Sequence, residues 1–243
     1  GIALTPAGKA VFEQLTEAAE AVRMVPHVAR EAARRIEGTL RLSMISDILC
    51  QDLDDALTSF AARHPDVTLR VEIRTWRSVL DAVQSGEADV GITYESESVP
   101  TVRYEPMLRE SQQLYCGRSH PLFGHSIRNP ATLAGERFIL AAADEPADVG
   151  RFRLHYDLGK NTVAQADDLS EAMRLIRLGM GIGFLPSIVA EPLGDRLWPL
   201  LPGSLRPSYF VYLITGDMAR LSTPAQLFHE EILRRLRARP GFI

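Results

Sequence analysis

Apolar and polar residues alternate over 39–45 and again over 67–73, and between these stretches apolar residues recur at helical spacing. Alternation is typical of half-buried strands, and spacings of three and four are typical of a helix packed on one face. Ser46 or Asp47 is expected to cap that helix, which should end before Pro65 because the residue preceding a proline disfavours helical geometry. A second helix is predicted at 77–85 and a third strand at 88–93. This order of strands and helices predicts a parallel sheet with right-handed crossovers.

The second half of the chain repeats the pattern. Strands are predicted at 113–116, 137–142, 162–166 and 209–215, and helices at 152–158, 170–180 and 224–239, with Ser170 as a cap. Two similar α/β units, with late sequence free to return to the first unit, predict a two-lobed α/β fold. The expected boundaries are 1–37 for a leading helix, 38–107 plus 209–243 for the first lobe, and 108–208 for the second. Ligands of open α/β sheets bind beyond the carboxyl ends of the strands, so a cleft between the lobes is the expected site.

The first 37 residues are predicted to form one long helix. Thr5 can cap it, and Pro6 occupies the first helical position, where the missing N–H costs nothing. The apolar residues follow the alternating spacing of a coiled-coil seam, although most of them are small alanines. A solvated amphipathic helix is one interpretation, but a helix that pairs with its twin is favoured because little of the chain remains to cover the seam. The predicted dimerisation residues are Phe12, Leu15, Ala19, Val22, Ala29, Ala33 and Ile36.

Composition narrows the class of protein. The 243 residues carry 27 Lys and Arg against 31 Asp and Glu, a net charge of −4, which disfavours a chain that coats nucleic acid along its whole length. No apolar run approaches the roughly 20 residues of a membrane span, and residues 1–14 lack the pattern of a signal peptide. Cys50 and Cys116 are expected to be buried free thiols. These observations predict a cytoplasmic protein with no membrane partner.

Signatures of catalysis are absent from the sequence. The six histidines form no zinc-binding spacing, and neither a nucleophile elbow nor a phosphate-binding loop is present. The glycines of GMGIG at 179–183 follow a predicted helix instead of a strand, which argues against a dinucleotide site. Neither a catalytic residue nor a metal or cofactor is therefore expected, and the protein is not expected to be an enzyme.

Several stretches in order resemble the LysR-type transcriptional regulators. They are LTPAGK at 4–9, GTLRL at 38–42, HPDV at 64–67, GEADVGI at 86–92 and LGMGIGFLP at 178–186. The resemblance implies that 1–37 holds the end of a winged helix-turn-helix followed by the dimerisation linker helix. It also implies a periplasmic-binding-protein-like effector domain after them. Most of the winged helix-turn-helix would be missing, and a truncated chain is the simpler expectation.

The resemblance implies that a small-molecule effector binds in the cleft and changes the geometry of a homodimer or homotetramer. DNA would be bound only through the missing N-terminal domain. The two crossing segments between the lobes would fall near 108–112 and 205–208. The effector contacts it implies are Ser46, Asp47, Ile48, Thr75, Trp76, Thr93, Tyr94, Ala141, Ala142, Ala143, Asp168, Leu169, Gly183 and Phe184.

Other interpretations stay open for these positions. Ser46, Asp47 and Asp168 can serve only as helix caps, and Trp76 can pack on the lobe surface. No arginine of the first lobe is obviously aimed at the cleft, so an effector with several carboxylates would rely on helix N-termini and on Arg151 or Arg153. A neutral polar or amine-bearing effector suits the charges better.

Two other functions share this layout. A periplasmic-type solute-binding protein has the same two lobes, but it should carry a secretory leader and lack the first helix. An enzyme on the same fold would need a set of catalytic residues, which the sequence does not show.

Overall fold

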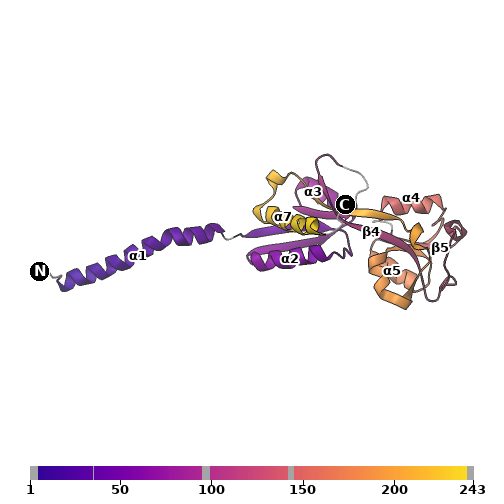
Figure 1. Cartoon of the computed structure of the whole chain (residues 1–243), viewed down its shortest axis with the longest axis horizontal. Helices are drawn as coiled ribbons and strands as arrows, with labels where there is room; N and C mark the ends of the chain where they lie inside the picture. The colour runs from indigo at the N-terminus through magenta and orange to yellow at the C-terminus, as the bar shows by residue number, and fades with distance from the viewer. Residues whose placement is uncertain (1–4, 35, 95–98, 142–144, 240–243) are drawn as a thin grey trace.

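The computed structural model describes residues 5–34, 36–94, 99–141 and 145–239. Helix α1 (Pro6–Arg34) leads away from an elongated α/β body (Figure 1). The predicted cap of this helix is confirmed, because the Thr5 hydroxyl oxygen accepts a hydrogen bond of 3.1 Å from the backbone N–H of Gly8. None of the helices among the described residues has the length and apolarity that a bilayer crossing needs.

The first lobe holds a mixed sheet between helices. Strands β1 (Gly38–Met44), β2 (Val67–Ile73) and β3 (Val90–Tyr94) are parallel, which confirms the predicted βαβαβ unit. Strand β9 (Ser208–Thr215) pairs antiparallel with β3, so the late sequence returns to the first lobe as expected. The helices of this lobe are α2 (Gln51–Arg63), α3 (Trp76–Ser85) and α7 (Thr223–Ala238).

The second lobe shares one long strand with the first. Strand β4 (Arg103–Gly117) pairs with β9 and then with β7 (Gly183–Pro186) and β8 (Leu197–Pro199), so both lobes share it. The prediction of a short strand at 113–116 is therefore wrong in length. This lobe also holds the parallel strands β5 (Arg137–Ala141) and β6 (Asn161–Ala166) and the helices α4 (Ala147–His155), α5 (Leu169–Arg177) and α6 (Ser187–Ala190). Short 3-10 turns lie at Pro130–Leu133, Glu191–Arg196 and Gly203–Leu205. One more 3-10 turn, at Met218–Arg220, follows β9 in the first lobe.

Helix starts differ most from the predictions. Helix α2 begins at Gln51 after Cys50, whose side chain makes no capping hydrogen bond, so the predicted cap by Ser46 or Asp47 is wrong. Helix α5 is capped by Asp168, not by Ser170, and α4 starts several residues before the predicted helix at 152–158. The loop between β1 and α2 is consequently longer than predicted, which leaves its polar residues free of a capping role.

A continuous apolar core stabilises the body. Leu40 of β1 and Ile92 of β3 are fully buried, and Phe60 of α2 meets Phe228 of α7 edge to face with ring centroids 5.5 Å apart. A smaller buried cluster in the second lobe includes Ile176. Cys50 and Cys116 are both buried and free, as predicted.

Candidate functional site

Two neighbouring cavities lie where the lobes meet. Their empty space, which includes open solvent, is about 460 Å³ for one and about 350 Å³ for the other, and they share Gln112, Ala141 and Leu169. The larger cavity is lined by Ile45, Ser46, Tyr94, Glu110, Gln112, Ala141, Asp167, Leu169, Pro186 and Tyr209, and the smaller one adds Phe138, Ile139, Leu140, Glu145, Pro146, Val149 and Phe184.

The fold explains why these residues meet. Ser46 follows β1 and Tyr94 ends β3, so both lie at the carboxyl ends of parallel strands. Glu110 and Tyr209 are direct cross-strand partners in the antiparallel pair of β4 and β9. Leu169 opens helix α5 on the other side of the cleft. The larger cavity is therefore bounded by both lobes and by the two strands that connect them.

A buried polar chain crosses the floor of the larger cavity. The Tyr209 hydroxyl donates a hydrogen bond to Oε2 of Glu110, and Nε2 of Gln112 donates one of 2.8 Å to the Tyr209 oxygen. Only 6% of the Glu110 surface is exposed. Burial raises the pKa of Glu110, and Asp47 raises it further, although the tyrosine hydrogen bond lowers it. Burial and the neighbouring Glu110 raise the pKa of Tyr209 as well.

An aromatic row stands beside this chain. The Tyr94 ring lies 5.3 Å from the Tyr209 ring, centroid to centroid, and 6.1 Å from the Trp76 ring. Trp76 is buried behind Tyr94 and is not part of either cavity lining, and the Arg77 guanidinium stacks over it at 4.3 Å. Asp47 adopts a left-handed backbone with φ of 58°, which is uncommon outside glycine and often marks a functional loop.

The structure gathers some of the predicted effector contacts and separates others. Ser46, Tyr94, Ala141, Leu169 and Phe184 line the cavities. Ala142 and Ala143 lie outside the described residues. A direct role in ligand contact stays a prediction for all of them.

The remaining predicted contacts have structural roles. Ile48 and Thr93 are buried, and the Thr75 and Asp168 side chains cap α3 and α5. A Cβ at Gly183 would lie 2.7 Å from Ile176 and 2.8 Å from a backbone oxygen, so a glycine is required there for packing. These residues line neither of the two cavities.

Most lining residues were not predicted from the sequence, and among them are Glu110, Gln112 and Tyr209, which form the buried polar chain. The signal that could have revealed them is the run Glu110 to Gln113, which places charged and amide side chains in a segment flanked by apolar residues. The sequence predicts a crossing between the lobes at 108–112, and in the structure that crossing also contributes to the floor of the cavity.

Fold and cavity together define a two-lobed α/β ligand-binding module that follows a long helix. Comparisons with known proteins identify the family: the LysR substrate binding domain family matches residues 33–237, and the chain belongs to it. The chain is 25% identical to the HTH-type transcriptional activator BauR of Pseudomonas aeruginosa, over 96% of the chain and 77% of BauR.

Solved structures share the fold. The effector binding domain of QuiR in complex with shikimate superposes with a TM-score of 0.71 at 15% identity, covering 82% of this chain and 97% of that one. Full-length CbnR in complex with its target DNA superposes with a TM-score of 0.64 at 19% identity, covering 96% and 82%. The predicted resemblance and the predicted fold class are thereby confirmed.

Proposed function

We propose that this chain is the effector-sensing and oligomerising part of a LysR-type transcriptional regulator, and that a small molecule binds in the cleft described above. The observation that carries the proposal is the Glu110–Tyr209–Gln112 chain, because buried polar groups at the floor of a largely apolar cavity are suited to orient a ligand. Shikimate bound to the effector domain of QuiR supports the same use of the fold.

The lobes we infer are 38–107 plus 209–243 and 108–208. Strands β4 and β9 connect them, and both contribute to the cavity floor. A ligand held between lobes shifts their relative arrangement only if it binds one arrangement better than another. A compound that contacts Ser46 in the first lobe and Leu169 in the second satisfies that condition, since its contacts change when the lobes move.

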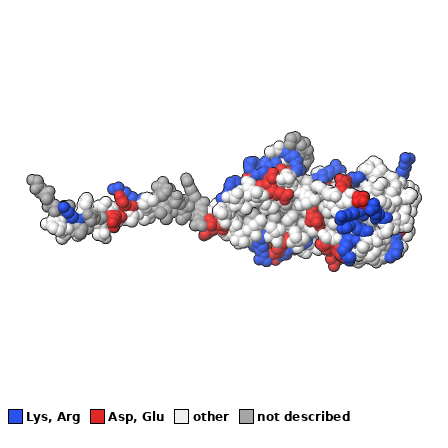
Figure 2. Space-filling view, turned by 90° about the horizontal axis from the view of Figure 1, so that it is seen from below, with Lys and Arg blue, Asp and Glu red and all other residues white. Residues whose placement is uncertain are grey.

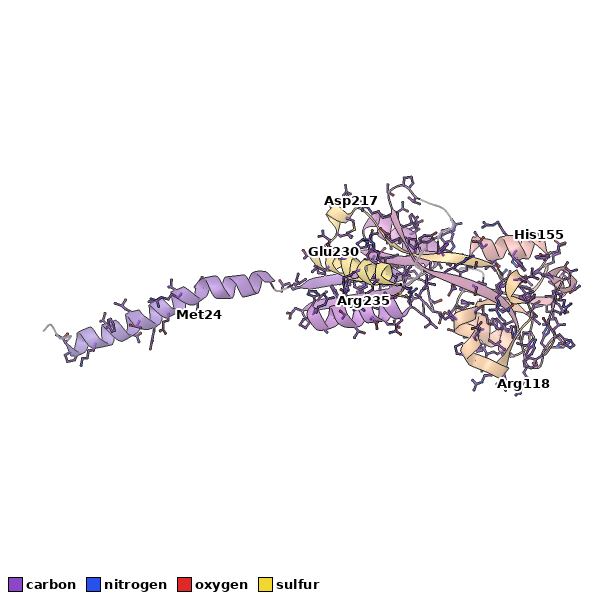
Figure 3. The ribbon with its side chains drawn as sticks, viewed as in Figure 1. Met24, Arg118, His155, Asp217, Glu230 and Arg235 are labelled. Atoms are coloured by element: carbon purple, nitrogen blue, oxygen red, sulfur yellow. The ribbon has the colours of Figure 1, made fainter. Side chains whose placement is uncertain are left out.

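A second copy of the chain is the partner we infer for α1. The helix extends away from the body, and Met24 points into open space (Figure 3). Phe12, Leu15 and Val22 of the predicted seam are 61%, 62% and 70% exposed. The side chains of Ala29 and Ala33 are not described, and Ile36 is half-buried. Apolar side chains this exposed at seam spacing need a partner helix.

The outer strand of the first sheet offers a second apolar surface. Leu69, Val71 and Ile73 of β2 share one face and are 40%, 45% and 60% exposed. An exposed apolar edge strand is typical of an interface. We infer that this face contributes to contacts between effector domains, in a homodimer or homotetramer.

Light scattering tests the role of α1. The full chain is expected to be a dimer or larger, and Leu15→Glu with Val22→Glu should reduce its mass, because charges on a coiled-coil seam oppose pairing. The matched control places the same charges outside the seam, at Gln14 and Ala21. An unchanged mass in the seam variant would overturn the role proposed for this helix.

The complete regulator is proposed to bind DNA, as CbnR does, and to work in the cytoplasm. We infer no catalytic role, metal or cofactor for this chain. A solute-binding protein shares the fold, but the match to LysR regulators across the chain favours the regulator.

Thermal unfolding with a library of small metabolites tests binding in the cleft. A ligand at one hundred times its Kd should stabilise the folded chain by about 2.7 kcal/mol. Ala141→Trp fills the space shared by both cavities and should remove that gain, whereas Ala62→Trp on the exposed side of α2 should keep it. Stabilisation that survives Ala141→Trp would contradict the proposed site.

A further inference from the structure

We propose that the effector carries a protonated amine, and that the Glu110 carboxylate receives it at the floor of the larger cavity. This inference rests on the proposed function, since it names the chemical class of ligand that the same cleft selects.

Glu110 lacks a positively charged partner within the described part of the chain. Its side chain accepts one hydrogen bond, from Tyr209 at Oε2, which leaves Oε1 available to a donor from the cavity. Asp167 lines the same cavity and Asp47 lies near enough to act on Glu110 electrostatically. A buried carboxylate is costly unless it is neutralised or paired with a cation.

Arginines near the cleft are directed elsewhere. Among the described residues, neither cavity is lined by a lysine or an arginine. Arg109 precedes Glu110, but strand alternation turns it to the opposite face, where its guanidinium donates to the Ser208 hydroxyl and lies over Phe210. Arg77 at the neighbouring helix start stacks on Trp76.

The two arginines that could have received a carboxylate are also engaged. Arg153 holds Glu145 with hydrogen bonds of 2.9 and 3.0 Å, and Arg151 pairs with Asp148. Four other arginines of the second lobe, Arg118, Arg174, Arg177 and Arg196, line a separate surface groove that includes the end of α5, and Figure 2 shows a basic patch on this lobe. Glu110 and Asp167 line the larger cavity, and no lysine or arginine lines it among the described residues, which opposes an anionic ligand and favours a cation.

The aromatic row complements this charge. An ammonium group beside Oε1 of Glu110 also lies near the Tyr94 and Tyr209 rings, which are packed edge to face. Aromatic faces attract cations, and the attraction grows in sites removed from water. A carboxylate and aromatic rings around one apolar cavity are the chemistry that recognises an organic amine.

Matched probes distinguish ligand charge from ligand shape. The first set is 1,4-diaminobutane, succinate and 1,4-butanediol, and the second is benzylamine, benzoate and benzyl alcohol. Thermal unfolding of the full chain with each probe should show stabilisation by an amine and none by its carboxylate or alcohol counterpart. Stabilisation by a carboxylate alone, lost in Ala141→Trp, would overturn the amine inference but leave the proposed cleft function intact.

Glu110→Gln tests the carboxylate. It should weaken amine binding by about tenfold or more, because the ligand charge then lies buried without its partner. Glu230→Gln, the same change on the exposed side of α7 (Figure 3), should leave binding unchanged. Asp167→Asn at the exposed edge of the cavity provides a second variant and should weaken binding less. Amine binding of equal strength in wild type and Glu110→Gln would overturn the inference, and amine binding that also survives Ala141→Trp would overturn the proposed cleft as well.

Discussion

Two glutamates of this protein are equally buried and differently surrounded. Glu231 of α7 is 5% exposed and forms ion pairs with Arg63, Arg234 and Arg235 at 2.9, 2.6 and 2.8 Å. Burial raises its pKa, but the three arginine hydrogen bonds outweigh burial and lower the pKa to about 2. Because Arg63 belongs to α2, this carboxylate fastens two helices of the first lobe together.

Glu110 is as little exposed, but no arginine or lysine pairs with it within the described residues. Its 6% exposure, its raised pKa and one tyrosine donor among the described residues indicate a carboxylate that the fold leaves incompletely satisfied. The difference separates two uses of a buried charge. A saturated carboxylate stabilises the fold, whereas one that faces a cavity with an open oxygen reduces stability until a ligand supplies the missing charge.

The largest effect on stability is expected from Glu231→Gln. Loss of the charge that holds three arginines should lower the free energy of unfolding by about 2 kcal/mol at pH 7, a figure reduced because two of the arginines are largely exposed. Urea unfolding measures it, with Glu230→Gln as the neighbouring control. Equal free energies of unfolding for the two variants would contradict the structural role proposed for Glu231.

A smaller effect of opposite sign is expected from Glu110→Gln. At pH 8, without ligand, the variant should be about 1 kcal/mol more stable than wild type, because it removes an ionised group from a buried site. A variant less stable than wild type at pH 8 would show that the carboxylate is satisfied within the fold.

The pH dependences of these two variants should run in opposite directions. The pKa of Glu110 in the folded chain is raised above 4.5. Below pH 4.5 the carboxyl is therefore protonated in both the folded and the unfolded chain, and wild type and Glu110→Gln should have the same free energy of unfolding. As the pH rises through the folded pKa, wild type should become less stable than the variant. Asp47, Asp167, Tyr94 and Tyr209 face this group, and the difference between variant and wild type isolates its contribution.

The difference in the free energy of unfolding between wild type and Glu231→Gln should depend on pH in the opposite way. The folded pKa of Glu231 is lowered, so the advantage of wild type is complete above pH 4.5 and disappears as pH falls towards 2. Urea unfolding across this range measures both differences. Parallel pH curves for the two variants would contradict the contrast between the sites.

The smallest effect is expected from an exposed pair. Glu171 of α5 forms hydrogen bonds of 2.6 and 2.7 Å with Arg174, and water competes for both groups. Glu171→Gln should therefore leave Tm unchanged within error. A clear loss of Tm would contradict the expectation that exposure to water cancels the contribution of this ion pair to stability.

Sequence patterns predicted the regular parts of the fold well. Alternation located β1, β2 and β9, and α3 ends at Gly86, with φ of 76°, directly after the helix predicted at 77–85. The predicted start of α2 was wrong because Asp47 adopts a left-handed backbone, so neither Ser46 nor Asp47 caps the helix, which begins at Gln51. Local patterns cannot reveal a backbone conformation imposed by the surrounding fold.

The floor of the cleft could not be predicted for a different reason. Glu110 and Tyr209 are 99 residues apart and meet only because β4 and β9 pair in one register. The polar run in β4 also concealed the length of the strand, since Glu110, Gln112 and Gln113 break the apolar pattern. Residues that a long-range strand pair brings together carry no short-range spacing signal.

A carbon-13 NMR titration of the Glu110 side-chain carboxyl, assigned by comparison with Glu110→Gln, tests the central claim most directly. Wild type should show a Glu110 pKa above the ordinary 4.5, and saturation with the stabilising amine should lower it, because a bound cation favours the ionised carboxylate. A Glu110 pKa that stays the same or rises when the amine binds would contradict the account.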